Sequence, residues 1–284
     1  MTHPAFGPAA RDALAAAYPE QPVLLSHGLA DHPLLQLDAL AALASRMRPS
    51  DARCFRGDVP TGVGRRNVPA SGLSPQETIE AIEKRGSWMV LTFLEQDPLY
   101  RALLDELLEE LAPVVQPLTG PMVQRQSYAF VSSPGAVTPF HFDPEHNILL
   151  QLRGEKVMYI FPAGDERFVP REVHEEFHHA GCNNLDWDES FAPSAFVAPL
   201  RPGDGVYVPV KAPHWVQNGA DAPSISFSIT WRSGWSAREG YAHGMNRLLR
   251  RAGMNPLAPR RFPADNHAKA LAFRGIQKVR RLVP

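Results

Sequence analysis

The sequence predicts a mainly β fold flanked by helices, and three features of the chain support this. Between Val123 and Trp231, short runs rich in β-branched and aromatic residues alternate with Gly, Pro and Asn/Asp turns, as in a sandwich or barrel. The residues before this stretch have apolar side chains at helical spacing, and the chain becomes helical and basic again after Trp235. We therefore divide the chain into a mainly helical N-terminal region (1–122), a β-rich core (123–235) with an insert (162–198), and a basic helical C-terminal region (236–284).

Helices dominate the region before the core. In chain order the sequence predicts helices over 34–48, 75–86 and 97–112, and a short strand over 87–94. Asp31 is the candidate cap of the first helix. The second begins with Pro75 after Ser74 and ends at Gly86, and the third is the clearest amphipathic helix, with leucines at i, i+3 and i+4.

The core is predicted from five short runs with a period of two. These strands are expected over 123–131, 147–152, 156–161, 205–210 and 224–231. The Arg153-Gly154 turn is expected to join the second and third runs as a hairpin.

The composition is that of an ordinary globular protein. Of the 284 residues, 44% are hydrophobic and 21% charged, and the formal net charge is −1, which gives no overall argument for nucleic acid or anionic membranes. No window approaches about 18–20 uninterrupted apolar residues, the length of a membrane span, and the N-terminus lacks the features of a signal peptide. Because Cys54 and Cys182 are far apart and form no disulfide framework, we expect a reducing, cytoplasmic location.

A metal centre is predicted from three residues. His141 and Asp143 are two apart on an expected strand, so their side chains point to the same face. His214, which follows a PGD turn and a short strand, is the best third ligand. Two histidines and one carboxylate leave three positions open on an octahedral ferrous ion, as in non-haem Fe(II) oxygenases. The His-x-Asp pair alone is weak, because so short a pattern arises often by chance.

A buried cation strengthens this interpretation. In the expected hairpin, Gln151 lies opposite Lys156, so Asn147, Gln151 and Lys156 share one face, which is also that of His141 and Asp143 if the strands stay in phase. A lysine that points into a barrel needs an anion, and the C5 carboxylate of 2-oxoglutarate is such an anion. The alternative is that Lys156 extends its ammonium to the barrel rim.

These residues resemble a known family. The segment TPFHFDPEHNILLQLRGEKVMYIFP (138–162) is similar to the core of the JmjC/cupin-like 2-oxoglutarate oxygenases, above all to the asparaginyl hydroxylase of hypoxia-inducible factor. In that group a Thr precedes the first ligand by three, an Asn follows the Asp by four, and a Lys lies nine beyond the Asn. Thr138, Asn147 and Lys156 match these positions. The resemblance covers residues 123–232.

The resemblance implies both fold and activity. It implies a double-stranded β-helix (cupin/jelly-roll) core with N-terminal and C-terminal helices, and iron bound by His141, Asp143 and His214. It further implies that Thr138, Asn147 and Lys156 bind 2-oxoglutarate. Where the family has a late Asn or similar residue, this chain has Ser226 or Ser228, and Tyr128 is a further candidate contact.

For function, the resemblance implies hydroxylation of a protein side chain or a small molecule, with release of succinate and CO2, or demethylation when the hydroxylated carbon is an N-methyl group. The alternative is a non-enzymatic cupin-like protein that binds metal and ligand in a regulatory role. Such proteins often lack a ligand or the lysine, and this chain has them all, which favours the enzyme.

Two features lie outside this pattern. His174, His178 and Cys182 are spaced at i, i+4 and i+8, which suits either a zinc-like site or, as we favour, an exposed insert beside the mouth of the site. The C-terminal region is rich in Arg and Lys, with Asp265 as its one acidic residue after residue 240. It lacks a cluster of aromatic residues that could stack on bases, so we favour a solvated helix face or a homodimer through these helices over contact with RNA or an acidic protein.

Overall fold

The computed structural model describes residues 4–62, 68–83, 86–181 and 185–282. The strands are β1 (Val23–Ser26), β2 (Ala52–Arg56), β3 (Ser87–Thr92), β4 (Met122–Ser132), β5 (Val137–His141), β6 (His146–Arg153), β7 (Lys156–Ile160), β8 (Phe196–Leu200), β9 (Asp204–Val208), β10 (His214–Asn218) and β11 (Ser224–Ser233). The helices are α1 (Pro8–Ala17), η1 (Pro33–Leu35), α2 (Leu37–Ala44), α3 (Pro75–Glu80), η3 (Leu94–Gln96), α4 (Pro98–Thr119), α5 (Arg171–Ala180), η4 (Glu189–Ser194), α6 (Gly234–Arg251) and α7 (His267–Leu282).

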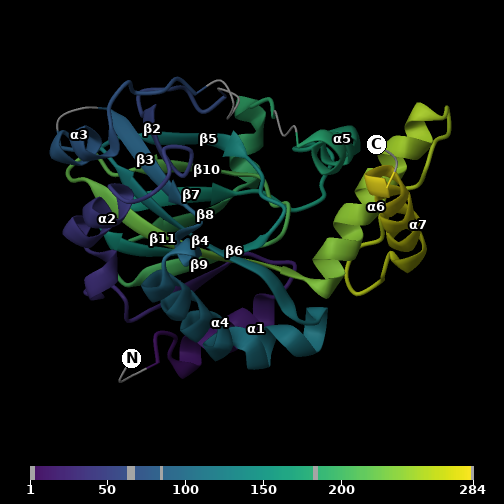
Figure 1. Ribbon diagram of the computed structural model, residues 1–284, viewed down its shortest axis with the longest axis horizontal. Coiled ribbons are helices and arrows are strands. Elements are labelled where there is room, and N and C mark those ends of the chain that lie inside the picture. Colours follow the sequence, from purple (N-terminus) through teal and green to yellow (C-terminus); the bar gives the residue numbers. More distant parts are fainter. Residues whose placement is uncertain (1–3, 63–67, 84–85, 182–184, 283–284) are drawn as a thin grey trace.

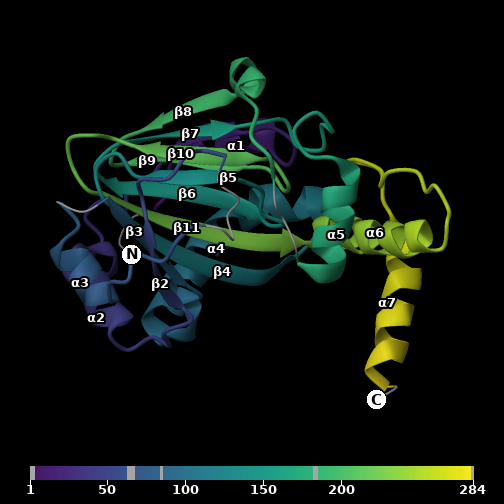
Figure 2. The ribbon, with the colours of Figure 1, turned by 90° about the horizontal axis from the view of Figure 1, so that it is seen from above.

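Two antiparallel sheets form the core, as Figures 1 and 2 show. The larger sheet has the strand order β1-β9-β6-β11-β4-β3-β2, and the smaller has the order β5-β10-β7-β8. From β4 to β7, and again from β8 to β11, consecutive strands of the chain alternate between the two sheets. This is the jelly-roll core with flanking helices that the sequence predicts, and the fold prediction is confirmed.

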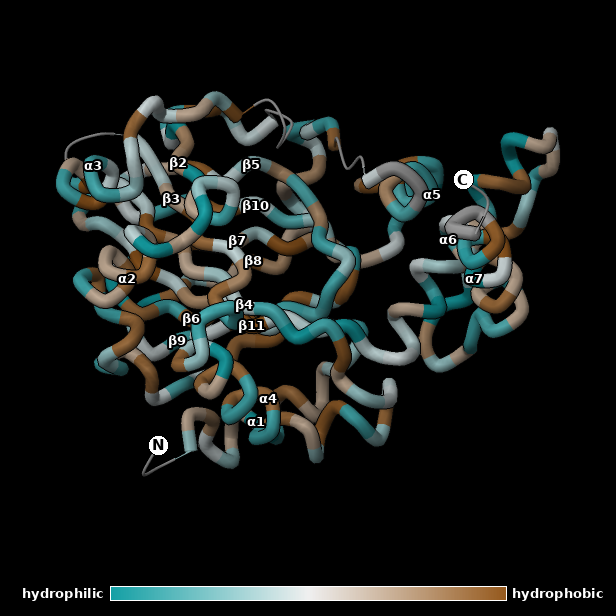
Figure 3. The backbone as a smooth tube through the Cα atoms, in the orientation of Figure 1, coloured by the Kyte–Doolittle hydropathy of each residue, from teal (hydrophilic) through white to brown (hydrophobic). Residues whose placement is uncertain are grey.

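The two faces of the larger sheet differ in polarity. Along β11, Phe227, Ile229 and Trp231 belong to the same buried apolar cluster as the leucines of α4, so this face is covered by helices. In Figure 3, hydrophobic and hydrophilic stretches alternate along α4 accordingly. The intervening residues of β11, such as Ser226 and Ser228, point to the other face, between the two sheets. A polar interior therefore separates the sheets at this point.

The insert covers the outside of the smaller sheet. Phe140 and Phe161, at the ends of β5 and β7, pack with Phe168 and Trp187 of the insert in an aromatic cluster. The last residues of the predicted insert also form β8, the edge strand that pairs with β7. The insert thus contributes one strand and a cover to the barrel.

The N-terminal region is less purely helical than the sequence predicts. It contributes β1, β2 and β3 to the larger sheet, where β3 pairs with β4 across the proposed boundary at residue 122. The strand predicted over 87–94 is β3, and α1, β1 and β2 were not predicted. The division into three regions stays a prediction.

The observed helix boundaries agree only in part with the predicted ones. Ser74 caps α3 in a capping box with Glu77, as its position after a loop predicts, but the helix ends at Glu80 rather than at Gly86. The predicted Asp31 cap is wrong, because Pro33 starts a separate 3-10 turn and α2 begins only after the extended residue Gln36. The third helix, α4, extends beyond its predicted end to Thr119, through two prolines.

The predicted hairpin between β6 and β7 is wrong. β6 pairs with β9 and β11 in the larger sheet, whereas β7 pairs with β10 and β8 in the smaller. Gly154, between them, has φ +67°, and a Cβ there would lie 2.4 Å from the carbonyl oxygen of Pro223. The chain therefore crosses between the sheets at a position that only glycine can occupy without strain.

Within the described residues, no helix has the length and apolar character needed to cross a bilayer. Cys54 is a half-buried free thiol, and Cys182 lies outside the described residues.

Candidate metal centre

His141, Asp143 and His214 meet at one end of the smaller sheet. His141 is the last residue of β5 and lies directly opposite His214, the first residue of β10. The Nε2 atoms of the two histidines each lie 3.7 Å from Oδ2 of Asp143. Among the described residues, this is the one group of three or more candidate ligands whose donor atoms all lie within 4.8 Å of one another. The structure thus brings together the three residues predicted as ligands.

Backbone carbonyls set the orientation of both imidazoles. Nδ1 of His141 lies 2.7 Å from the carbonyl oxygen of Pro139, and Nδ1 of His214 lies 2.9 Å from that of Ala212. Because a carbonyl only accepts, each Nδ1 carries the proton and each Nε2 presents its lone pair toward Asp143. Two neutral imidazole nitrogens and one carboxylate oxygen suit a divalent ion such as Fe(II), so the donor set fits the predicted metal.

Three further predicted residues line the cavity beside these ligands. Thr138 reaches it from β5, Asn147 from β6 and Lys156 from β7, so both sheets contribute. The rest of the wall is mainly apolar and is formed by Trp88, Phe130, Ser132, Leu149, Met158 and Val216. A mainly apolar wall with a few polar groups is typical of ligand pockets.

Lys156 is the buried cation of this cavity. Only 4% of its surface is exposed, which does not suit a lysine that reaches out to the rim. Burial lowers the pKa of its ammonium to about 7, and no carboxylate among the described residues opposes that shift. An anion bound in the cavity would therefore gain an ion pair that the protein itself does not supply.

Three predicted contacts do not line the cavity wall. Ser228 is buried and donates a hydrogen bond of 2.6 Å to Oδ1 of Asn147, so it reaches the cavity through that amide. Ser226 donates instead to Oε1 of Gln151, which closes the end of the barrel through its bonds to Arg153 and Gly154. Tyr128 lies opposite Ser228 on β4, but it is not among the residues of the cavity wall, and its hydroxyl donates to Gln126 at 3.0 Å.

The sequence of this chain matches a known protein family. Residues 83–235 match the family model described as a cupin-like domain. The chain belongs to the cupin-like domain family. A match of this extent also confirms the fold expected from the resemblance.

Two curated relatives carry Jumonji names. This cupin-like chain is 31% identical over 109 residues to Jumonji C domain-containing protein 5 of Drosophila melanogaster, covering 36% of this chain and 27% of the relative. It is 27% identical over 228 residues to lysine-specific demethylase JMJ30 of Arabidopsis thaliana, covering 74% and 50%. The JmjC/cupin resemblance is confirmed, and the chain spans half or less of the length of these relatives.

Solved structures of Escherichia coli YcfD share the fold. One has a TM-score of 0.55 at 17% identity and covers 94% of this chain and 67% of that one. Another, described as a ribosomal oxygenase in complex with cobalt and 2-oxoglutarate, has a TM-score of 0.50 at 16% identity and covers 93% and 65%.

His174 and His178 of the insert do not form an exposed site in this cupin-like protein. His174 is buried, and α5 packs against α6, where the rings of His174 and His178 lie 5.2 and 5.5 Å from that of His243. The expectation of an exposed insert is therefore wrong for α5, because His174 and His178 face α6 rather than solvent. The third member of the predicted group, Cys182, lies outside the described residues.

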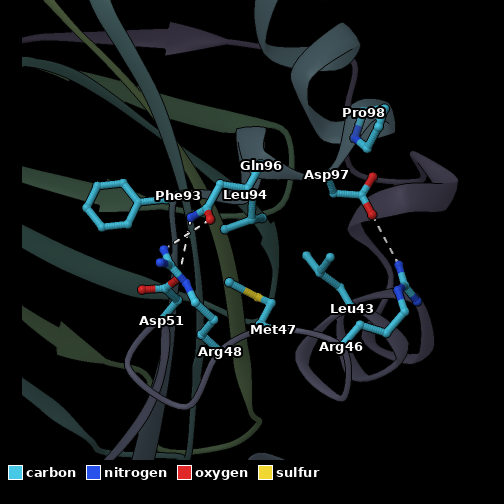
Figure 4. Close-up of a pocket in the computed structure, with 10 residues that line it drawn as sticks. All are labelled: Leu43, Arg46, Met47, Arg48, Asp51, Phe93, Leu94, Gln96, Asp97 and Pro98. Carbon is cyan, nitrogen blue, oxygen red and sulfur yellow. Dashed lines mark hydrogen bonds and ion pairs between the residues drawn. The ribbon is translucent and has the colours of Figure 1, made fainter.

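The groove in Figure 4 lies away from the metal centre, between α2, η3 and the start of α4. Its charged side chains pair with one another, Arg48 with Asp51 at 2.7 Å and Arg46 with Asp97 at 3.2 Å. It offers no candidate ligand set, so we assign it no role in the chemistry.

Sequence reasoning missed two parts of the site. Trp88 lines the cavity from β3, which is buried on both faces and so lacks the alternation that marks an inward residue. Lys211 was also missed, although its backbone N–H donates to the carbonyl oxygen of Asp143 at 2.9 Å. Its place three residues before His214 was the one signal available.

Proposed function

We propose that this cupin-like protein is an Fe(II)- and 2-oxoglutarate-dependent oxygenase. The observation that supports it most is the meeting of three metal ligands and one buried ammonium in a single cavity. A metal site alone fits many functions. A metal site in one cavity with a buried lysine that pairs with no carboxylate among the described residues fits a ligand with a metal-binding end and a far carboxylate, and 2-oxoglutarate is such a ligand.

The proposed role of each residue follows from its position in the cavity. His141, Asp143 and His214 would hold the iron, and the carbonyls that fix the two imidazoles keep their nitrogens aimed at it. Lys156 would pair with the C5 carboxylate, with the Thr138 hydroxyl as a second donor.

Asn147 would bind the cosubstrate nearer the metal. Its Oδ1 accepts from Ser228, which leaves its NH2 group to donate into the cavity. Tyr128 stays a proposed contact, although it is not part of the cavity wall.

Iron bound here would supply the oxidative chemistry, in which O2 and 2-oxoglutarate convert a substrate C–H to C–OH with succinate and CO2 as co-products. The chain's own residues bind, orient and exclude water. The mainly aromatic and aliphatic wall would limit the access of solvent to the reacting groups, and the ammonium of Lys156 would orient the cosubstrate through its C5 carboxylate.

We propose hydroxylation of a protein side chain or a small molecule as the outcome. One relative is named a lysine-specific demethylase and one structural neighbour a ribosomal oxygenase. Both names are consistent with this reaction type, because removal of an N-methyl group begins with hydroxylation of its carbon.

The test has two steps. Anaerobic addition of Fe(II) and 2-oxoglutarate to the purified protein should give a weak visible charge-transfer band, and no band would reject the proposal. Succinate release stimulated by a cellular fraction would then show turnover. A band without succinate from any fraction would favour the alternative of a non-enzymatic binding protein.

We also propose that the chain forms a homodimer through its C-terminal helices and acts in the cytoplasm. α7 packs on α6 through Phe273, against Gly244, yet leaves Leu271 and Val279 74% and 60% exposed. Figure 2 shows that α7 projects away from the sheets. Light scattering of the wild type and of Leu271→Lys tests the dimer, and a monomeric wild type would reject it.

A further inference from the structure

The backbone at Lys211 and Ala212 contacts two of the proposed ligands, Asp143 and His214. Lys211 lies on the loop between β9 and β10, three residues before His214. Its backbone N–H donates to the carbonyl oxygen of Asp143 at 2.9 Å. The carbonyl of the next residue, Ala212, accepts the Nδ1 proton of His214. The conformation of this loop therefore bears on the position of both ligands.

The backbone of Lys211 is unusual. Its φ is +64°, in the left-handed region that residues with a Cβ seldom adopt. Such a conformation persists only where the surroundings hold it. One anchor is the backbone hydrogen bond to Asp143.

The second anchor is a buried ion pair with α6. The ammonium of Lys211 contacts a carboxylate oxygen of Glu239, and these residues are only 7% and 3% exposed. The same ammonium lies 3.5 Å from Nε2 of His243, one turn further along α6. The contact joins the loop that precedes His214 to α6, a helix that contributes no residue to the cavity wall.

We propose that Lys211 and Glu239 are a positioning pair, through which α6 sets the places of Asp143 and His214. The inference rests on the proposed metal site. Without the pair, the loop would relax from its left-handed conformation, the bond to the Asp143 carbonyl would be lost, and the ligands would no longer be held at metal-binding distance. Helix α6 thus becomes a supporting part of the metal centre.

A double variant separates positioning from plain stability. Removing one partner of a buried ion pair leaves an uncompensated charge, whereas replacing both with apolar residues restores much of the stability. Lys211→Met and Glu239→Leu should each lower the Tm, and the double variant should recover it. If the pair positions the ligands, the double variant should still bind Co(II) about 10–100-fold more weakly than wild type, the usual loss for outer-shell partners.

Two controls complete the experiment. Arg238→Gln breaks the neighbouring contact of α6 with Asp265 and should change the Tm without changing Co(II) affinity. Amide hydrogen exchange at residue 211 in the metal-free protein should be faster in the double variant than in the wild type.

The outcomes are distinct. Weakened Co(II) binding and faster exchange in a double variant of normal Tm support the pair as a positioning device. Wild-type Co(II) affinity and exchange in that variant overturn it and leave the proposed function intact. A wild-type protein that binds no metal overturns the proposed function, and with it this inference.

Discussion

His141 and His214 lie directly opposite each other on the antiparallel strands β5 and β10, and their ring centres are 4.2 Å apart. The strand register therefore holds two candidate ligands side by side in the metal-free fold. Asp143 completes the set from just beyond the end of β5. A preformed site of this kind needs little rearrangement on binding, so the loss of any ligand should act on affinity and not on the fold.

Asp143→Ala should abolish stable metal binding. Outer-shell changes already cost about 10–100-fold in metal affinity, so loss of a ligand should cost more than about 100-fold. Calorimetric titration with Co(II) measures this, and Asp38→Ala, at an exposed position on α2, is the matched control. Unchanged Co(II) affinity in Asp143→Ala, with the fold intact by circular dichroism, would show that the ligand assignment is wrong.

Lys156→Met should separate ligand binding from stability. Methionine keeps the length of the side chain and removes a buried charge, so the ligand-free protein should be at least as stable as the wild type. Without the ammonium, 2-oxoglutarate should bind with a loss on the order of 2–4 kcal/mol, or about 30- to 1,000-fold. Anaerobic titration of the metal-loaded protein with 2-oxoglutarate gives the affinity. Wild-type affinity in Lys156→Met would exclude the lysine as the carboxylate partner.

The affinity for 2-oxoglutarate should fall as pH rises above about 7. Burial lowers the pKa of Lys156 to about 7 in the folded protein, so between that pH and its ordinary pKa the unfolded chain binds more protons. Stability of the ligand-free protein should therefore rise with pH across this window. Binding of a carboxylate requires the ammonium, so above pH 7 the protein must take up a proton, and affinity should weaken toward about tenfold per pH unit.

Calorimetry in buffers of different ionisation enthalpy at pH 8 should detect that proton uptake. A dissociation constant that stays level from about pH 6.5 to 9 would show that Lys156 is already charged in the free protein, or that it does not bind the carboxylate.

His141 and Asp143 could be paired as candidate ligands from sequence because they are only two residues apart, although Asp143 lies just beyond the end of β5 rather than on the predicted strand. The sequence prediction placed Lys156 in the observed cavity for a wrong reason. It assumed that β6 and β7 pair as a hairpin, but they lie in facing sheets. Asn147 and Lys156 share the interior because each points inward from its own sheet. The alternation of residues along a strand predicts which side chains share a face. Only the tertiary fold determines what that face contacts.

Other features depend on tertiary structure and leave little trace in the sequence. β3 is buried along its whole length and shows no alternation. α4 continues through Pro113 and Pro117, where local propensity predicts an end, because its leucines pack on the larger sheet. The partner of Lys211 comes from α6, 28 residues along the chain, and no local pattern connects the two.

Gly154→Ala should destabilise the fold where the chain crosses between the sheets. The substitution meets two costs, a φ of +67° and a Cβ only 2.4 Å from the carbonyl oxygen of Pro223, which is backbone and cannot move aside easily. Gly135→Ala is the control, because its φ is +72° but nothing lies within 4 Å of the added Cβ. The conformational cost alone is of order 1–3 kcal/mol, and steric overlap adds a similar amount at Gly154. Urea unfolding should therefore rank Gly154→Ala clearly below Gly135→Ala. Equal free energies of unfolding for the two variants would mean that the crossing is not as tight as the contact with Pro223 requires.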